Sequence, residues 1–284
     1  MKLFRFGDSG KEQPGVELPQ GKRISVAAFG EDFNEHFFAH DGLSRLRDWL
    51  SVHASKQPEA TAQVRIAAPI ARPPAIICVG LNYRKHAEES GAPIPREPIL
   101  FMKHPGSYSG PNDPIVIPRG SEKTDWEVEL AIVIGRGGHN ITEQLWRDHV
   151  AGFSVMNDVS ERTWQLERGG QWDKGKGFPT FSPIGPCLVT TDEIKNPGNL
   201  RLWLEVNGRC FQNGNTSDMI FTVGQIVSYA SQCFHLLPGD VITTGTPSGV
   251  GLGQKPPRYL QAGDVLRLGI DGIGVLEQKC ISAG

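Results

Sequence analysis

The sequence has almost no net charge and no long apolar run. Its 284 residues include 29 Lys and Arg against 31 Asp and Glu, a formal net charge of −2. This balance argues against the basic surface that binds nucleic acids or anionic membranes. No window approaches the roughly 18 consecutive apolar residues of a membrane span. Residues 1–15 lack the apolar core of about 7–15 residues that a signal peptide needs. We therefore expect a soluble protein, most simply of the cytoplasm.

Cysteine is scarce and scattered. The five cysteines never form a CxxC pair, so they give neither a disulfide framework nor the ligand spacing of a zinc site. This usage is typical of a reducing compartment. The cysteines are Cys78, Cys187, Cys210, Cys233 and Cys280.

Glycine and proline, in contrast, are abundant. Gly 34 and Pro 21 make 55 of 284 residues, about one in five, against an average nearer ~12%. The 38% of apolar residues excludes a disordered chain. Such a composition indicates many short elements joined by tight turns, and it excludes a helical bundle.

The hydrophobic patterns divide the chain in two. Lys2–Phe6 alternates like a strand, and Leu43–His53 has the spacing of a short amphipathic helix. The pair Pro73-Pro74 interrupts the chain before the apolar strand Ala75–Val79. We place a boundary near residue 70, between a small N-terminal α+β domain (1–70) and a second domain (71–284).

Strand patterns dominate the second domain. Four strands are predicted in addition to Ala75–Val79, and helical periodicity is found mainly in Ile141–Val150 and Val223–Phe234. Since no alternation of strand and helix is sustained, the fold class is mixed and mostly β, with antiparallel pairing. The predicted strands are Glu127–Ile134, 200–206 (ending at the turn Asn207-Gly208), Val241–Thr244 and Val265–Ile270.

An acidic strand is the most informative segment. Side chains two apart on a strand point to one face, which places Glu127 and Glu129 ~6.5–7 Å apart along the chain. Like charges repel, and the strand continues into apolar residues, so a cation is expected between them. Asp158 follows the apolar run 152–156 and can add a third carboxylate. Such oxygen ligands suit Mg²⁺, Mn²⁺ or Ca²⁺. The alternative is a half-exposed strand with an unrelated turn aspartate.

A short polar segment can supply a general base. His86 and Glu89 stand three residues apart in a predicted helix over 84–90, where a carboxylate can orient an imidazole that activates water. Gly80 and Gly91 flank the helix, which can then act as a mobile lid. The alternative is a solvated polar turn.

Two glycine-rich stretches resemble nucleotide-binding motifs, but neither matches its motif fully. Residues 170–176 match a P-loop, but Gly177 stands where Ser or Thr must bind Mg²⁺. Residues 249–253 lack the spacing of a dinucleotide fingerprint. What remains is Lys176 in a loop between glycines, either beside a developing oxyanion or on the surface. Likewise, the turn at Thr246 is functional only if it faces the metal.

In this order, the segments resemble the fumarylacetoacetate hydrolase family over roughly residues 73–280. The resemblance implies that Glu127, Glu129 and Asp158 hold Mg²⁺, with His86 and Glu89 as a catalytic pair and Lys176 beside the reacting oxygen. It implies substrate contacts from Arg162, Gln165 and Thr246, a β-rich roll and a homodimer. The segments that carry it are Val79–Tyr83 with His86 and Glu89, Pro98–Lys103, Glu127–Leu130, Asn157-Asp158, Lys176 with 183–186, and Thr244–Gly251.

Within the family, residues 123–127, 161–177 and 253–257 are most similar to the 2,4-diketo-3-deoxy-L-fuconate hydrolases, often labelled ureidoglycolate lyases. This implies hydrolysis of a C–C bond in a 2,4-dioxo sugar acid, giving pyruvate and a second acid such as lactate. The alternatives are a 2-oxo acid isomerase, hydratase or decarboxylase of the same family, a ureidoglycolate lyase, and a metal-binding protein without activity.

Overall fold

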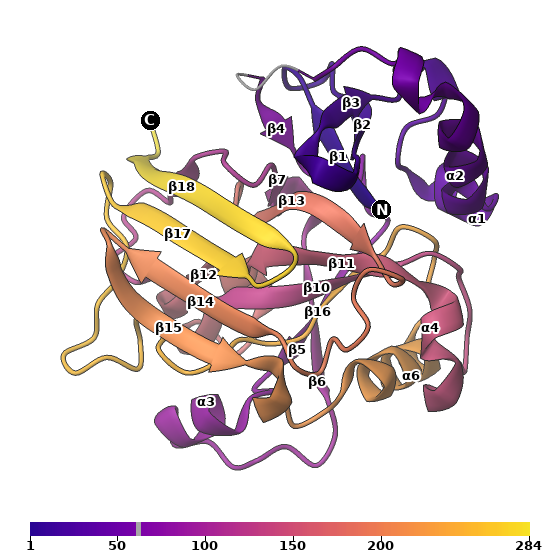
Figure 1. Ribbon diagram of the computed structural model, residues 1–284. Helices are drawn as coiled ribbons and strands as arrows, with labels where there is room; N and C mark the ends of the chain where they lie inside the picture. Colours follow the sequence, from indigo (N-terminus) through magenta and orange to yellow (C-terminus); the bar gives the residue numbers. More distant parts are fainter. Residues whose placement is uncertain (61–63) are drawn as a thin grey trace.

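The computed structural model describes residues 1–60 and 64–284, and strands dominate it. The larger sheet has eleven strands, and a five-stranded sheet packs against it (Figure 1). A two-stranded ribbon of β9 (Thr124–Asp125) and β12 (Ser160–Glu161) adjoins them. The pairs β5–β16, β7–β13 and β8–β18 are parallel and the others antiparallel, which confirms the predicted fold class.

The order of the larger sheet is β3 (Arg23–Ser25), β2 (Gln13–Glu17), β1 (Lys2–Phe6), β13 (Ser182–Thr190), β11 (Val150–Asn157), β10 (Val128–Ile134), β16 (Val241–Thr243), β5 (Ile76–Gly80) and β6 (Ile99–Lys103). Off this path, β4 (Ile66–Ala67) pairs with β1 and β7 (Tyr108–Ser109) with β13. The smaller sheet runs β15 (Arg209–Asn215), β14 (Arg201–Val206), β17 (Val265–Ile270), β18 (Gly274–Ser282) and β8 (Ile115–Ile117).

The α-helices are short. They are α1 (Glu35–Ala39), α2 (Gly42–His53), α3 (Arg84–Glu89), α4 (Trp146–His149), α5 (Asp173–Lys176) and α6 (Val223–Cys233). A π-helical turn spans Thr163–Glu167, and 3₁₀ turns span Pro19–Gly21, Ala27–Phe29, Ala54–Lys56, Pro105–Ser107, Glu143–Leu145 and Thr216–Asp218. In the part of the chain that the structure describes, every helix is too short or too polar to cross a lipid bilayer.

One face of strand β10 packs into the core, and the opposite face is the side of the acidic residues. Its even-numbered residues, such as Leu130 and Ile132, pack with Leu204 of β14 and Leu268 of β17 between the two sheets. Each such buried leucine or isoleucine contributes roughly 1.5–3 kcal/mol. The odd-numbered residues point away from this core, so Glu127 and Glu129 share one face, as the alternation predicts.

The N-terminal residues continue the larger sheet. Strand β1 pairs with β13 through Lys2↔Val189 and Leu3↔Leu188. Leu3 and residues of α1 and α2 share a second apolar cluster with Ile76 and Ala131 of the central strands. The boundary near residue 70 stays a prediction, since residues 1–70 are joined to the second unit by strand pairing and by packing.

Most predicted elements are confirmed, and two are wrong. Residues 141–150 form only a 3₁₀ turn and the single turn α4, because Val150 begins β11, which is buried and paired on both sides. Lys176 does not lie in an open loop but ends the short helix α5. The turn at Asn207-Gly208 has the positive φ angles of 52° and 77° that its sequence predicts.

Candidate metal centre and its cavity

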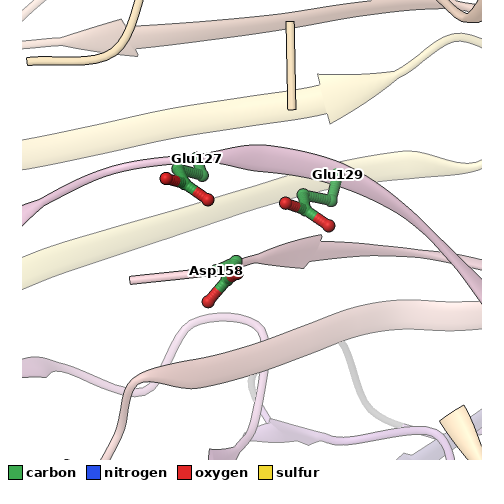
Figure 2. Close-up of side chains that lie close together, drawn as sticks. All are labelled: Glu127, Glu129 and Asp158. Carbon is green, nitrogen blue, oxygen red and sulfur yellow. The ribbon is translucent and has the colours of Figure 1, made fainter. Parts of the chain in front are cut away.

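Three carboxylates meet where β10 and β11 run side by side. Val128 is opposite Asn157 in the antiparallel register, so Glu127 and Glu129 flank that pair and Asp158 follows it. The backbone N–H of Asp158 donates to the carbonyl of Glu127 over 2.9 Å. Each of the three side chains offers an oxygen within 4.8 Å of the others, and all three are buried. Figure 2 shows the three side chains close together, with Glu127 and Glu129 on one segment and Asp158 on the neighbouring one.

Two of these carboxylates already have cationic partners. Lys176 Nζ lies 2.8 Å from both Glu127 Oε2 and Asp158 Oδ2, and Lys103 Nζ donates to Asp158 Oδ1. Arg162 Nη2 lies 2.7 Å from Glu127 Oε1. Burial opposes ionisation of Glu127, but Lys176 and Arg162 outweigh it and lower its pKa to about 2. Glu127 is therefore an anion at neutral pH.

Glu129 lacks such a partner. Its carboxylate accepts the backbone N–H of Gly245 over 2.9 Å, and no ion pair involves it among residues 1–60 and 64–284. Burial and the neighbouring Asp158 and Glu127 raise the pKa of Glu129 well above its usual range. Buried oxygen donors that are short of positive charge fit a hard divalent cation. The residues present therefore fit the metal that the resemblance implies.

Lys176 reaches the carboxylates because α5 packs tightly on the preceding turn. A Cβ atom on Gly175 would lie 2.5 Å from the carbonyl oxygen of Glu161 and from the backbone nitrogen of Gln165, so only glycine allows this approach. The Lys176 ammonium also lies 5.2 Å from the centroid of the Phe101 ring. Burial lowers the pKa of Lys176, but Asp158 and Glu127 outweigh burial and raise it. The lysine remains charged.

Arg162 is held by a carboxylate that the sequence analysis did not select. Asp125 Oδ2 accepts from Arg162 Nε over 2.8 Å, and the same aspartate accepts the backbone N–H groups of Trp126, Gly251 and Leu252. Arg162 Nη1 donates to Gln165 Oε1 over 2.9 Å. Asp125 thus fixes the guanidinium that contacts Glu127.

The pair His86 and Glu89 forms on α3. His86 Nδ1 lies 3.3 Å from Glu89 Oε2, and both oxygens of Glu89 accept the backbone N–H of Gly249, over 3.0 and 3.1 Å. A Cβ atom on Gly253 would lie 2.4 Å from the Glu89 carboxyl carbon, so this loop holds the carboxylate closely. The same glycine-rich loop therefore contacts Glu89 and Asp125.

Eight of the nine predicted site residues line one cavity of about 250 Å³. Glu89 does not line it and instead holds His86. The Thr246 hydroxyl donates to the carbonyl of Val128 over 2.9 Å and accepts from Gln212 Nε2 over 2.8 Å, so its proton is already used within the protein. The eight are His86, Glu127, Glu129, Asp158, Arg162, Gln165, Lys176 and Thr246.

Comparison with known proteins identifies the class. Residues 75–281 match the family model described as fumarylacetoacetate (FAA) hydrolase C-terminal, so the chain belongs to the fumarylacetoacetate hydrolase family. The chain is 53% identical over 275 residues to a Burkholderia ambifaria protein named "Putative hydrolase", covering 96% of each chain. Proteins of this class are enzymes, which supports a catalytic use of the cavity.

Two solved structures resemble the chain over its full length. Fumarylacetoacetate hydrolase from Exiguobacterium antarcticum is 37% identical with a TM-score of 0.86, covering all of both chains. Maleylpyruvate hydrolase from Sphingobium sp. SYK-6, in complex with manganese(II) and pyruvate, is 28% identical with a TM-score of 0.83 and the same coverage. They confirm the β-rich family fold.

Two residues of this site escaped the sequence analysis as functional candidates. Lys103 ends β6, and the Ile99–Lys103 run gives no sign that its last side chain is buried beside Asp158. Asp125 precedes the acidic strand by two residues, which is a usable signal, since an odd-numbered residue there faces the same side as Glu127.

Proposed function

We propose that the protein is a metal-dependent hydrolase that cleaves the C3–C4 bond of a 2,4-dioxo acid and releases pyruvate and a second acid. One observation carries this proposal. His86, which Glu89 holds through Nδ1, lines one small cavity together with Lys176 and the carboxylates Glu127, Glu129 and Asp158. Mg²⁺ is the cation we expect, with Mn²⁺ or Ca²⁺ as substitutes.

Glu127, Glu129 and Asp158 would hold the cation, which when bound supplies a Lewis acid for the substrate's oxygens. The ammonium of Lys176 has three N–H donors and spends two on Glu127 and Asp158. The third can reach an oxygen in the cavity. A fixed donor of this kind stabilises the negative charge that develops on the 4-oxo oxygen.

We assign His86 as the base. With Nδ1–H donated to Glu89, the other ring nitrogen, Nε2, accepts a proton from water. The hydroxide adds to C4, the C3–C4 bond breaks, and its electron pair leaves with C3 as the enolate of pyruvate. Proton transfer from His86 Nε2 to C3 completes pyruvate, and C4 becomes the carboxyl group of the second acid, which gives its proton to water on release. Water is the only co-reactant.

Arg162 and Gln165 are the proposed substrate contacts. Arg162 Nη1 orients the Gln165 carboxamide by donating to Oε1, which leaves the Gln165 NH₂ group as a donor toward a substrate oxygen. For Thr246 the hydroxyl proton is committed to Val128, so we propose that it acts as a wall of the cavity.

Product analysis tests this proposal. The metal-loaded enzyme is incubated with a 2,4-dioxo acid, and pyruvate, the second acid and CO₂ are measured together. We expect pyruvate and the second acid in equal amounts. CO₂ without the second acid would indicate a decarboxylase, which needs no activated water, and would overturn the proposal.

Isomerisation is the second candidate, because the chain resembles solved isomerases. One is 2-hydroxyhepta-2,4-diene-1,7-dioate isomerase from Mycobacterium marinum, 33% identical with a TM-score of 0.76. An isomerase moves a proton without releasing two products, so the same product analysis separates the two reactions. The sugar-acid substrate, the cytoplasmic location and the homodimer stay proposals, and sedimentation velocity would test the dimer.

A further inference from the structure

The cavity has a charged inner end and an apolar outer end. Glu129 and Lys176 at the inner end are each 2% exposed. Leu166 and Leu252, which also line the cavity, are 46% and 38% exposed and therefore lie at its mouth. If the proposed function holds, the acid end of the substrate sits at the charged inner end. Its tail, the group attached to C4, then extends toward the leucines.

The cationic side chains of the cavity are already engaged. Among the described residues that line it, permanent positive charge comes from Arg162 and Lys176. Arg162 is bound to Asp125 and Glu127, and Lys176 to Glu127 and Asp158. His86 faces Glu89 and is reserved for the water proton in the proposed reaction.

Arg168, two positions after the mouth residue Leu166, does not line the cavity. The Arg168 guanidinium carbon lies 4.1 Å from the centroid of the Trp164 ring, in a stacked contact. A second carboxylate at the end of the tail would therefore meet leucine side chains with no cationic partner in the lining. Lying against these half-exposed leucines removes part of the water around that carboxylate and gives it no cationic partner in return, which costs free energy, whereas an apolar tail gains from the same contact.

We propose that this cavity selects monocarboxylic substrates, that is 2,4-dioxo acids with a short uncharged tail, and discriminates against those whose tail ends in a carboxylate. This inference deepens the proposed function and rests on it for the direction in which the substrate lies. The apolar mouth, in particular Leu166 and Leu252, is the specificity-determining wall.

A matched pair of acids that cannot be hydrolysed tests the preference by binding alone. 2-Oxopentanoate and 2-oxoglutarate have the same chain length, and the second carries a terminal carboxylate where the first has a methyl group. Calorimetric titration into the Mn²⁺-loaded protein should give a dissociation constant at least about tenfold lower for 2-oxopentanoate. Equal affinities, or tighter binding of 2-oxoglutarate, would overturn the inference.

A second matched pair tests turnover. We expect kcat/KM for 2,4-dioxohexanoate to exceed that for 2,4-dioxohexanedioate at least about tenfold. Hydrolysis of both at equal efficiency would contradict the inference and leave the proposed function standing. Hydrolysis of neither, with the binding preference retained, would refute the proposed function and support the charge preference.

Substitution at the mouth tests the wall itself. Leu166→Lys should lower the ratio of the two binding constants by at least about threefold, because the ammonium can pair with the terminal carboxylate. Leu166→Gln has a comparable length without the charge, and it should leave the ratio within about twofold of wild type. If both variants change the ratio equally, or Leu166→Lys leaves it unchanged, Leu166 does not contact the tail.

Discussion

Replacing Asp125 with Asn should lower both the free energy of unfolding and the affinity for substrate, because Asp125 accepts hydrogen bonds from several buried donors. The carboxylate accepts from Trp126 N and Gly251 N at Oδ1, and from Leu252 N and Arg162 Nε at Oδ2. In Asp125→Asn one oxygen becomes an NH₂ group, which faces two of these donors. Each buried donor left without an acceptor costs about 1–3 kcal/mol.

The magnitude follows from burial. The Asp125 side chain is 0% exposed and the Arg162 side chain 6%, so the variant breaks a buried ion pair. Breaking such a pair typically costs about 3–5 kcal/mol. We expect the free energy of unfolding, measured by urea titration, to fall by about that amount. Because Arg162 also loses its anchor, KM should rise more than kcat falls.

Asp264→Asn is the matched control. Asp264 also pairs with an arginine, Arg258, over 2.7 Å, and accepts from Asn207, but neither Asp264 nor Arg258 lines the site cavity. The control should lower stability without changing KM. A loss below about 1 kcal/mol in Asp125→Asn, or the same KM in both variants, would refute the role assigned to Asp125.

Three further predictions concern the base, the metal and the second buried lysine. Glu89→Gln keeps an acceptor for the backbone N–H of Gly249 but removes the negative charge beside His86. In steady-state assays kcat should therefore fall by about 10²-fold or more, with KM little changed. An unchanged kcat would exclude His86 and Glu89 as the general base. Burial and the nearby carboxylates raise the pKa of Glu129 in the folded protein above its unfolded value of about 4.5, so the folded state favours the protonated side chain. The stability that this side chain contributes is therefore complete below a pH of about 4.5 and is lost as the pH rises through the folded-state pKa. Thermal unfolding in EDTA should therefore show falling stability with rising pH, and Mg²⁺ should bind more tightly as pH rises and release a proton, whereas pH-independent calorimetric affinity would contradict this. Lys103→Met leaves the buried Asp158 with one cation fewer. The free energy of unfolding, measured by urea titration, should fall by about 3–5 kcal/mol, and Mg²⁺ should restore part of the loss. A variant as stable as wild type in EDTA would contradict this prediction.

The sequence predicted the parts of the site that follow from local periodicity. Alternation on β10 was enough to place Glu127 and Glu129 on one face, and the end of an apolar run placed Asp158 beside them. The spacing of His86 and Glu89, three residues apart on a helix, likewise predicted that their side chains are in contact. These relations depend on the pitch of one strand or one helix, which the residue pattern fixes.

What the sequence could not predict depends on contacts between distant segments. Lys103 and Asp158 are 55 positions apart, and burial of the lysine follows from strand order, not from its own neighbours. The helical turn α5 exists because it packs on the π-helical turn, although the glycines around Lys176 suggested an open loop. The pairing of β1 with β13 joins residues that periodicity alone assigned to separate domains.

Calorimetric titration of Mn²⁺ into the metal-stripped protein tests the central claim most directly. The wild-type protein should bind one ion per chain, and Glu129→Gln should abolish or greatly weaken this binding, because the glutamine removes the carboxylate that has no cationic partner among the described residues. Circular dichroism and urea titration should show that the variant remains folded. Binding of one ion with unchanged affinity in Glu129→Gln would place the metal elsewhere and contradict the account.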